Sequence, residues 1–260
     1  MAGVSIHITQ GVVTCTLDNG QRRNALTAGM LATLIETLKQ AQTDSTLRAV
    51  VVRGANGTFC SGRDLSELDA QRDHRPSPED AIAPVTQLAR AMHACPVPTL
   101  AVVEGKAVGL GVALASWCDM VIATDSALFS IPEARAGVPP TFTAVSLAQT
   151  LGQRRALSLC LTGRPLSATQ AQSFGLAHFV FPDADFEAQV QNLVQDLLKG
   201  GPNAQRHCKA LLGQVGSDAF DAAIQLAQRA AIDAMGSAES QEGIQAFKEK
   251  RPPAWYKGGL

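Results

Sequence analysis

The sequence lacks a long apolar run: within its 260 residues, no window of apolar residues is long enough to cross a membrane. Residues 1–10 (MAGVSIHITQ) also lack a basic segment followed by an apolar one. We therefore expect no signal peptide, no membrane anchor and no transmembrane helix. With 46% hydrophobic and 17% charged residues, the composition is typical of a globular protein that buries a substantial core.

The sequence also lacks an excess of charge of either sign. Lys and Arg number 22, Asp and Glu number 23, and the formal net charge is -1 at pH 7. Such a balance provides no field that would attract nucleic acid or an anionic membrane. We expect neither as a partner, so an anionic ligand has to be bound by local groups.

Cysteines spaced as metal ligands are missing as well. No CxxC pair occurs, and no histidine cluster lies close to a cysteine in the sequence. The six cysteines are scattered: Cys15, Cys60, Cys95, Cys118, Cys160 and Cys208. This pattern predicts free, mostly buried thiols, a cytoplasmic location and no metal site.

The first half of the chain alternates between β-like and helical patterns. Residues 4–9 and 12–17 are rich in β-branched residues and flank a Gln-Gly pair, which predicts a hairpin. Thr27 can cap a helix with apolar residues at helical spacing. Short buried strands are expected at residues 49–54, 99–103 and 120–123, and an exposed polar loop at residues 71–79.

After Pro140 the pattern becomes almost entirely helical. A short β run is expected at residues 177–181. Helices are expected at residues 141–151, 154–161, 167–174, 184–198, 203–212, 218–235 and 237–248. A C-terminal helical layer of this kind more often serves packing or assembly than chemistry.

Two glycine-containing turns could carry chemistry, because each follows a strand and leads toward a helix. They are residues 54–65 (GANGTFCSGRDL) and 105–115 (GKAVGLGVALA). Small residues let a ligand approach the backbone, and amides at a helix start point outward, so both turns can donate N–H groups to an oxygen anion. A plain tight turn is the alternative for either alone. A dinucleotide site is disfavoured because the third glycine and the ribose-binding acid are missing, and no spacing supports a nucleophilic triad with Ser61 and His93.

Several segments resemble, in order and spacing, the enoyl-CoA hydratase/isomerase (crotonase) family. Residues 59–65 (FCSGRDL) and 103–115 resemble the two oxyanion segments of that family. Residues 23–26 (RNAL) resemble its "NAL" opening, residues 129–133 (FSIPE) its "F-x-x-P-E" segment, and residues 247–251 (FKEKR) its C-terminal motif. The agreement spans nearly the whole chain.

The resemblance implies an α/β fold built as a spiral of ββα repeats, followed by a C-terminal helical trimerisation region. It divides the chain into a core domain at residues 1–200, which carries the acyl-CoA site, and a helical region at residues 201–260 for assembly and coenzyme A contact. A homotrimer or a hexamer built as a dimer of trimers is implied.

The resemblance also implies roles for individual residues. The backbone N–H groups of Arg63 and Leu110 would form the oxyanion hole, and Glu133 would be the catalytic acid or base. The substrate is an acyl-CoA thioester, and no cofactor beyond its coenzyme A moiety is implied. Coenzyme A would be bound by Arg22, Cys60, Ser61, Asp64, Leu65, Phe247 and Lys250. The pocket residues would be Ala113, Pro139 and Thr141.

One departure from the family pattern affects the expected reaction. Hydratases of the family carry a second glutamate where this chain has Ala113, and alanine cannot transfer a proton. Shifting a double bond requires one base, whereas adding water is easiest with two carboxylates. The sequence therefore favours isomerisation. Hydration remains an alternative if Glu67, Asp69 or Asp73 supplies the acid, and a non-catalytic acyl-CoA-binding protein is a further alternative.

Overall fold

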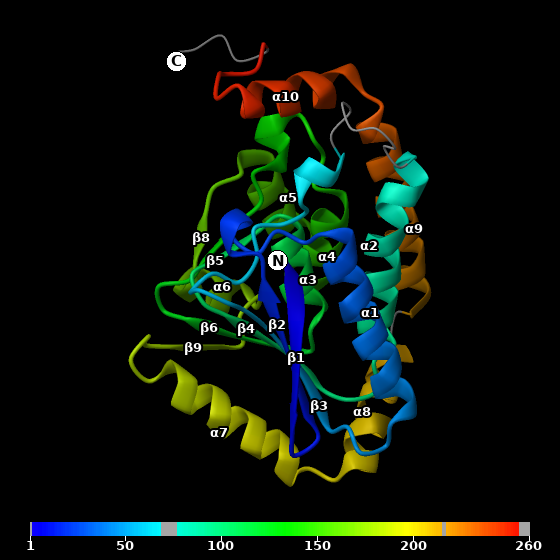
Figure 1. The fold of residues 1–260 in the computed structure, drawn as a ribbon, viewed down its shortest axis with the longest axis vertical. Helices are drawn as coiled ribbons and strands as arrows, with labels where there is room; N and C mark the ends of the chain where they lie inside the picture. Colours follow the sequence, from blue (N-terminus) through cyan, green and yellow to red (C-terminus); the bar gives the residue numbers. More distant parts are fainter. Residues whose placement is uncertain (1, 69–76, 215–216, 255–260) are drawn as a thin grey trace.

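A six-stranded sheet organises the chain, with strand order β1-β2-β3-β4-β6-β9 (Figure 1). The computed structural model describes residues 2–68, 77–214 and 217–254. The strands are β1 Gly3–Thr9, β2 Val12–Asp18, β3 Ala49–Gly54, β4 Thr99–Val103, β6 Met120–Thr124 and β9 Phe179–Phe181. β1 and β2 form the predicted antiparallel hairpin, and every other neighbouring pair is parallel.

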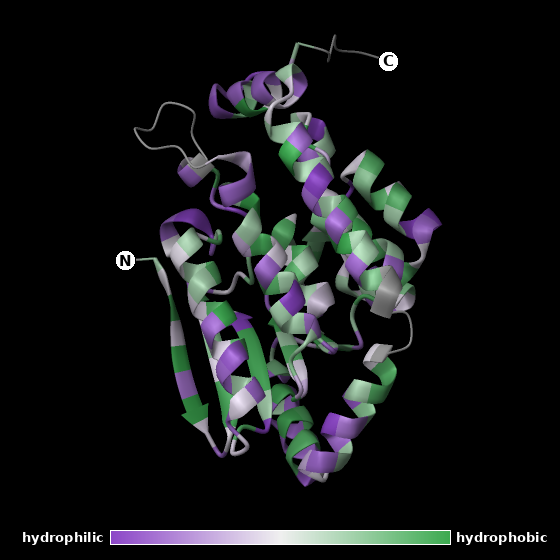
Figure 2. Ribbon diagram, turned by 90° about the vertical axis from the view of Figure 1, so that its right-hand side faces the viewer, coloured by the Kyte–Doolittle hydropathy of each residue, from purple (hydrophilic) through white to green (hydrophobic). Residues whose placement is uncertain are grey.

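The hairpin turns at Gln10 and Gly11, which both have positive φ. A side chain on Gly11 would collide with the Thr46 carbonyl oxygen, because a Cβ there would lie 2.5 Å from it. The inner strands are apolar on both faces, as expected for parallel strands covered by helices. Figure 2 shows these strands as predominantly hydrophobic, whereas the helices that cover them alternate between hydrophobic and hydrophilic residues.

Helices cover both faces of this sheet. α7 Phe186–Lys199 packs Phe186 and Val190 against one face. The other face contacts α1 Ala28–Thr43, which begins at the predicted cap, since the Thr27 hydroxyl accepts a hydrogen bond from the Met30 N–H. α2 Pro78–His93 packs beside α1.

A second sheet of three short strands lies close to the functional residues described below. Its order is β5-β7-β8, and its strands are β5 Lys106–Val108, β7 Leu128–Ser130 and β8 Leu166–Ser167. Between β5 and β6 the chain forms α3 Leu110–Trp117. The 3-10 helices are η1 Gly20–Arg22, η2 Leu65–Leu68 and η3 Glu133–Ala136.

The second half of the chain is helical, as predicted. Its helices are α4 Thr141–Leu151, α5 Gln153–Thr162, α6 Ala168–Phe174, α8 Pro202–Gln214, α9 Ser217–Met235 and α10 Ala238–Lys248. α9 packs against α2 and α4, and α10 packs against η3 at the opposite end of the molecule from α7 (Figure 1). The Lys209 ammonium connects α8 to the large sheet by an ion pair with Asp119.

The structure is a mixed α/β fold, and the spiral of ββα repeats stays a prediction. The division at residue 200 and the trimerisation role of residues 201–260 also stay predictions. One local prediction is wrong in part: Pro78 and Glu79, assigned to an exposed loop, lie in the first turn of α2. Residues 71–76 of that predicted loop lie outside the described residues.

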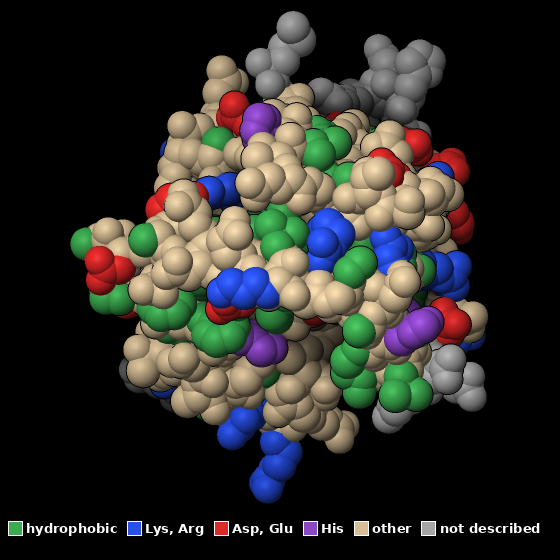
Figure 3. All heavy atoms as spheres, turned by 90° about the horizontal axis from the view of Figure 1, so that it is seen from below, with side chains coloured by type: hydrophobic (Ala, Val, Ile, Leu, Met, Phe, Trp, Pro, Cys, Tyr) green, Lys and Arg blue, Asp and Glu red, His purple; other side chains and the backbone are tan. Residues whose placement is uncertain are grey.

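Within the described ranges, no helix is long and apolar enough to cross a membrane. The face seen from below in Figure 3 carries basic, acidic and hydrophobic side chains interspersed, and no broad field of one sign forms among the residues drawn in colour there. This mixture agrees with the near-zero net charge.

Candidate functional site

The two glycine-containing turns lie side by side. Cys60 forms a parallel bridge with Ala107 of β5, and its carbonyl oxygen accepts a 2.8 Å hydrogen bond from the Val108 N–H. A Cβ built on Gly62, which has φ +99°, would lie 3.1 Å from the Val108 carbonyl oxygen and 3.5 Å from the Leu110 nitrogen. The sequence therefore brings both expected oxyanion segments to one place.

The "NAL" segment fixes the first turn in position. The Leu26 N–H donates to the Gly62 carbonyl oxygen at 2.7 Å, and the Leu26 carbonyl oxygen accepts from the Asp64 N–H at 3.0 Å. Asn24 is buried with φ +59°, a conformation that asparagine tolerates better than most residues. Its side-chain amide donates to the carbonyl oxygens of Ala55 and Thr58. This segment therefore holds the first turn in place through backbone and side-chain hydrogen bonds.

The backbone N–H groups of Arg63 and Leu110 are available as donors. Leu110 is the first residue of α3, so its N–H has no partner inside the helix. The hydrogen bonds across the Leu26–Arg63 bridge use the N–H groups of Leu26 and Asp64 rather than that of Arg63. Neither donor is used by another group in the described part of the chain. Two such amides can stabilise a developing oxyanion, and removing one comparable donor costs about 3 kcal/mol elsewhere.

Glu133 begins η3, immediately after the short strand β7 and Pro132. Burial raises the pKa of its carboxyl group to about 7, although a backbone hydrogen bond opposes the shift. Its Oε2 atom is buried and has no hydrogen-bond partner among the described residues. A carboxyl group that titrates near neutrality can both accept and return a proton.

The Glu133 carboxylate lies against the second glycine turn. A Cβ built on Gly109, which has φ +54°, would lie 2.5 Å from Oε1 of Glu133. Leu110, the next residue, carries the candidate oxyanion N–H. The Glu133 carboxylate and this N–H therefore both lie next to Gly109. Burial, followed by the charge of Glu133, raises the pKa of the Cys160 thiol on α5 to about 11.

Among the described candidates, no second carboxylate is free to act beside Glu133. Ala113 lies in α3 and is fully buried. The carboxylate of Glu67 is engaged elsewhere, because it accepts a 2.8 Å hydrogen bond from the Ala28 N–H and forms a 3.1 Å ion pair with Arg63. The other two candidate acids, Asp69 and Asp73, lie outside the described residues.

Five of the seven expected coenzyme A residues lie around η1 and the first turn. The Arg22 guanidinium contacts the Asp64 carboxylate at 3.3 Å, and about half of the Arg22 side chain is exposed. The Ser61 hydroxyl donates to the Arg22 carbonyl oxygen, and Leu65 is exposed. Cys60 lies beneath them and is fully buried, and burial raises the pKa of its thiol to about 12. An exposed cation beside an open turn can bind a phosphate.

Phe247 and Lys250 lie near the C-terminal end of α10 and are exposed. No hydrogen bond or ion pair connects them to Arg22 or Asp64 within residues 2–68, 77–214 and 217–254. α10 is fixed at its other end, where the Ser240 hydroxyl donates to the Gly137 carbonyl oxygen at 2.8 Å.

Pro139 and Thr141 lie between η3 and α4. Pro139 lines a cleft of about 600 Å³ between this segment and the C-terminal part of α9. Thr141 is the first residue of α4, as predicted, but it is not the N-cap: Pro140 occupies that position, and no side chain caps the helix.

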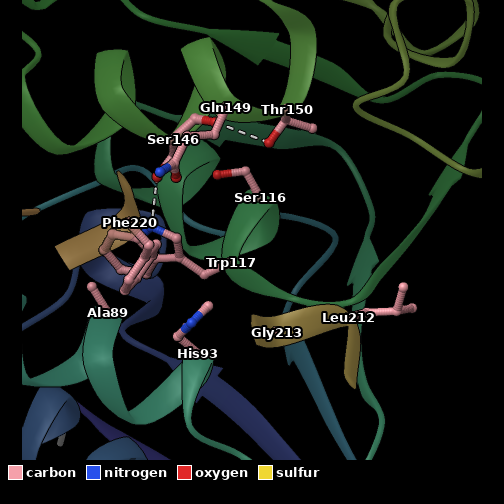
Figure 4. Close-up of a pocket in the computed structure, with 10 residues that line it drawn as sticks. All are labelled: Ala89, His93, Ser116, Trp117, Ser146, Gln149, Thr150, Leu212, Gly213 and Phe220. Carbon is pink, nitrogen blue, oxygen red and sulfur yellow. Dashed lines mark hydrogen bonds between the residues drawn. The ribbon is translucent and has the colours of Figure 1, made fainter. Parts of the chain in front are cut away.

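Figure 4 shows a second cavity, of about 390 Å³, whose lining includes neither Glu133 nor the two glycine-containing turns. It is lined by residues of α2, α3, α4, α8 and α9, among them the His93 and Phe220 rings, which stack with centroids 4.0 Å apart. Trp117 lines this cavity at the opposite end of α3 from Leu110, about 10 Å along the helix axis.

Comparisons with known proteins identify the family of the chain. A family model described as "Enoyl-CoA hydratase/isomerase" matches residues 7–258. The chain belongs to the enoyl-CoA hydratase/isomerase family. It is therefore related to enzymes of the crotonase superfamily, which act on acyl-CoA thioesters.

Individual relatives resemble the chain over most of its length. An enoyl-CoA hydratase domain-containing protein 3, mitochondrial, of Mus musculus is 32% identical and covers 94% of this chain and 81% of its own. A 1,2-epoxyphenylacetyl-CoA isomerase of Escherichia coli K12 is 31% identical and covers 95% of both chains. The crystal structure of an enoyl-CoA hydratase from Mycobacterium avium subsp. paratuberculosis K-10 superposes with a TM-score of 0.88 at 29% identity and covers 98% of both chains.

Some residues that shape this family site were not identified from the sequence. Thr143, on the first turn of α4, donates its hydroxyl to the Gly109 carbonyl oxygen at 3.1 Å. The Ser130 carbonyl oxygen accepts from the Gly109 N–H at 2.9 Å and so connects β7 to the glycine turn. A sequence of one chain gives no signal for contacts between residues so far apart. No cluster of metal-ligating side chains occurs in the described part of the chain.

Proposed function

We propose that the chain is an enzyme that forms an enolate from an acyl-CoA thioester and shifts a double bond, with Glu133 as its single catalytic carboxylate. The observation that carries the proposal is the position of this carboxylate. It lies against Gly109, next to the free N–H of Leu110, and the first turn places Arg63 beside the same segment. An oxyanion site and a group that titrates near neutrality are thus adjacent.

In the proposed mechanism, the N–H groups of Arg63 and Leu110 donate to the thioester carbonyl oxygen. The Glu133 carboxylate removes a proton from the α-carbon of a 3-enoyl-CoA, and the electron pair moves into the enolate, which the two amides stabilise. Glu133 then returns the proton at the γ-carbon, and the double bond lies between the α- and β-carbons. No atom is gained or lost. A pKa of about 7 for Glu133 suits both steps.

Ala113 supports isomerisation over hydration. A buried methyl group replaces the side chain that could orient water or supply a second proton. Hydration of a 2-enoyl-CoA is a second candidate, because the mycobacterial relative is named as an enoyl-CoA hydratase and the mouse relative as a protein that contains an enoyl-CoA hydratase domain. The bacterial relative that is named as an isomerase supports the first candidate.

Coenzyme A binding is proposed to involve Arg22, Ser61, Asp64 and Leu65. Cys60, which is buried, is proposed to fix the conformation of the turn. The exposure of Arg22 and its fixed position beside Asp64 support a phosphate contact. Phe247 and Lys250 are proposed to contribute from a neighbouring subunit, since both are exposed and unconnected to Arg22 in one chain. A homotrimer or a hexamer in the cytoplasm, with no cofactor beyond the coenzyme A of the substrate, completes the proposal.

The decisive experiment follows two reactions with the parent protein and Glu133→Gln. Solvent deuterium exchange at the α-carbon of a saturated acyl-CoA reports enolate formation. A panel of trans-3-enoyl and trans-2-enoyl substrates reports migration and water addition. We expect exchange and migration by the parent, and at least a roughly hundredfold loss in Glu133→Gln, because the amide keeps the volume but cannot transfer the proton. Absence of exchange in the parent, or activity of Glu133→Gln within a few-fold of the parent, would contradict the proposal.

A further inference from the structure

The peptide group between Gly109 and Leu110 has two functional ends. Its N–H belongs to Leu110 and is the candidate oxyanion donor in the second turn. Its carbonyl oxygen belongs to Gly109 and accepts hydrogen bonds from the Val112 N–H at 2.9 Å and the Ala113 N–H at 3.2 Å. These two bonds are those of an ordinary helix start.

A third hydrogen bond to the same carbonyl oxygen comes from a different helix. The Thr143 hydroxyl donates to the Gly109 oxygen at 3.1 Å, across 34 residues of sequence. Thr143 is only 2% exposed, so this bond forms where water does not compete. A hydrogen bond at the carbonyl end of an amide draws electron density from its nitrogen, so the N–H at the other end becomes a stronger donor.

Resting on the proposed function, we propose that Thr143 is a positioning residue for the oxyanion hole: its hydroxyl orients and polarises the Gly109–Leu110 peptide, so that the Leu110 N–H binds the enolate oxygen more strongly. Thr143 itself touches no reacting atom. The effect of Thr143 is largest in the transition state. A stronger N–H donor stabilises the negatively charged enolate oxygen more than the neutral thioester oxygen.

Helix α4 also contacts α3 at a second point. This second contact makes it possible to test the proposed effect of Thr143 on the peptide separately from the packing of the two helices. The Trp117 indole N–H donates to the Ser146 hydroxyl at 2.5 Å, at the end of α3 that is remote from Leu110 (Figure 4). Ser146 is as buried as Thr143 and lies one turn later on α4. Loss of the Ser146 hydroxyl weakens the contact between the two helices without touching the Gly109–Leu110 peptide.

The test compares Thr143→Val, which keeps the shape but removes the donor, with Thr143→Ser, which keeps the donor, and with Ser146→Ala. We expect Thr143→Val to lower kcat about tenfold and to change KM less than about twofold, since the lost interaction is strongest in the transition state. Thr143→Ser should retain most of kcat. Ser146→Ala should lower the melting temperature and leave kcat within about twofold.

A spectroscopic measurement separates this inference from the proposed function. Butyryl-CoA with ¹³C at its thioester carbonyl is bound to each variant, and the infrared stretch of that carbonyl is compared with that of the free ligand. We expect a downward shift with the parent, a smaller shift with Thr143→Val and the full shift with Ser146→Ala. A full shift and unchanged kcat in Thr143→Val would overturn the role of Thr143 and leave the oxyanion hole intact. No shift in the parent would overturn the proposed oxyanion hole, and the role of Thr143 with it.

Discussion

The carboxylate of Glu133 lies so close to Gly109 that a methyl group on the glycine would come within 2.5 Å of Oε1. The proposed base and the proposed oxyanion turn therefore constrain each other directly. A larger residue at position 109 has to move one of them, and movement of about 1 Å at a reacting centre can cost about a hundredfold in rate.

Gly109→Ala should consequently lower activity by at least about a hundredfold. The substitution also forces alanine to φ +54° and ψ -119°, a region that residues other than glycine rarely adopt, at a cost of about 1–3 kcal/mol. Gly57→Ala is the matched control: Gly57 has φ +64°, and a Cβ there would meet no atom within 4 Å. We expect Gly57→Ala to be destabilised by the strain of its own positive φ, measured by urea unfolding, and to keep its activity. Equal activity losses in the two variants would show that strain alone is responsible.

The pH dependence of the isomerisation should report the carboxyl group of Glu133. Burial raises its pKa from 4.5 to about 7. Because proton removal requires the ionised form, kcat/KM should rise about tenfold per pH unit below about pH 7 and level off above it. Initial rates between about pH 5 and pH 9 provide the measurement. A rate that falls as the pH rises through 7 would show that the protonated form is the active one.

The same shift makes stability depend on pH. Because the pKa of Glu133 is higher in the folded chain than in the unfolded chain, the folded state binds the proton more tightly, and the free energy of unfolding falls as pH rises from about 4.5 to about 7. The full loss is on the order of 3 kcal/mol. Glu133→Gln removes this titration, so its stability relative to the parent should increase between about pH 5 and pH 8. Glu36→Gln, at an exposed glutamate of α1, is the control for the loss of one carboxyl group.

Arg22 allows a test of coenzyme A binding that is independent of the chemical step. Arg22→Ala should weaken the affinity for a saturated acyl-CoA by several-fold at low salt, because an exposed cation near a phosphate contributes up to about 1 kcal/mol. Arg22→Lys, which keeps the charge, should retain most of the affinity. Calorimetry at increasing ionic strength should show the difference shrinking. An unchanged dissociation constant for Arg22→Ala would exclude Arg22 from the site.

The sequence allowed prediction of those parts of the site that depend on local patterns. Strand β3 and helix α1 follow from apolar spacing and from the Thr27 cap, and Arg63, Leu110 and Glu133 follow from short motifs. Helix α2 was missed because it follows a polar, proline-containing stretch and carries Pro84 inside it, a residue that usually ends a helix.

The remaining features arise only from tertiary contacts. The pKa of Glu133 depends on how completely η3 is covered, and no property of the FSIPE segment encodes that burial. The bond from Thr143 to Gly109 joins residues 34 positions apart on different helices, and a buried threonine on α4 is indistinguishable in the sequence from one that only packs.

Ala113 provides the sharpest test of which reaction the single carboxylate supports. Ala113→Glu places a carboxyl group at a fully buried position of α3, at the position where hydratases of the family carry a second glutamate. Burial and the charge of Glu133 should both keep the new group protonated near neutrality, where it can supply a proton. We expect measurable water addition to crotonyl-CoA and a loss of stability of a few kcal/mol, because the new group has no hydrogen-bond partner.

Ala113→Gln is the control for this experiment, since it adds nearly the same volume but no acid. It should lose stability to a similar extent and gain no hydration. The parent should migrate a 3-enoyl double bond faster than it hydrates a 2-enoyl one. If the parent hydrates crotonyl-CoA as efficiently as it isomerises any 3-enoyl-CoA, one buried carboxylate is sufficient for water addition, or a second acid is present. Ala113 would then not determine the reaction.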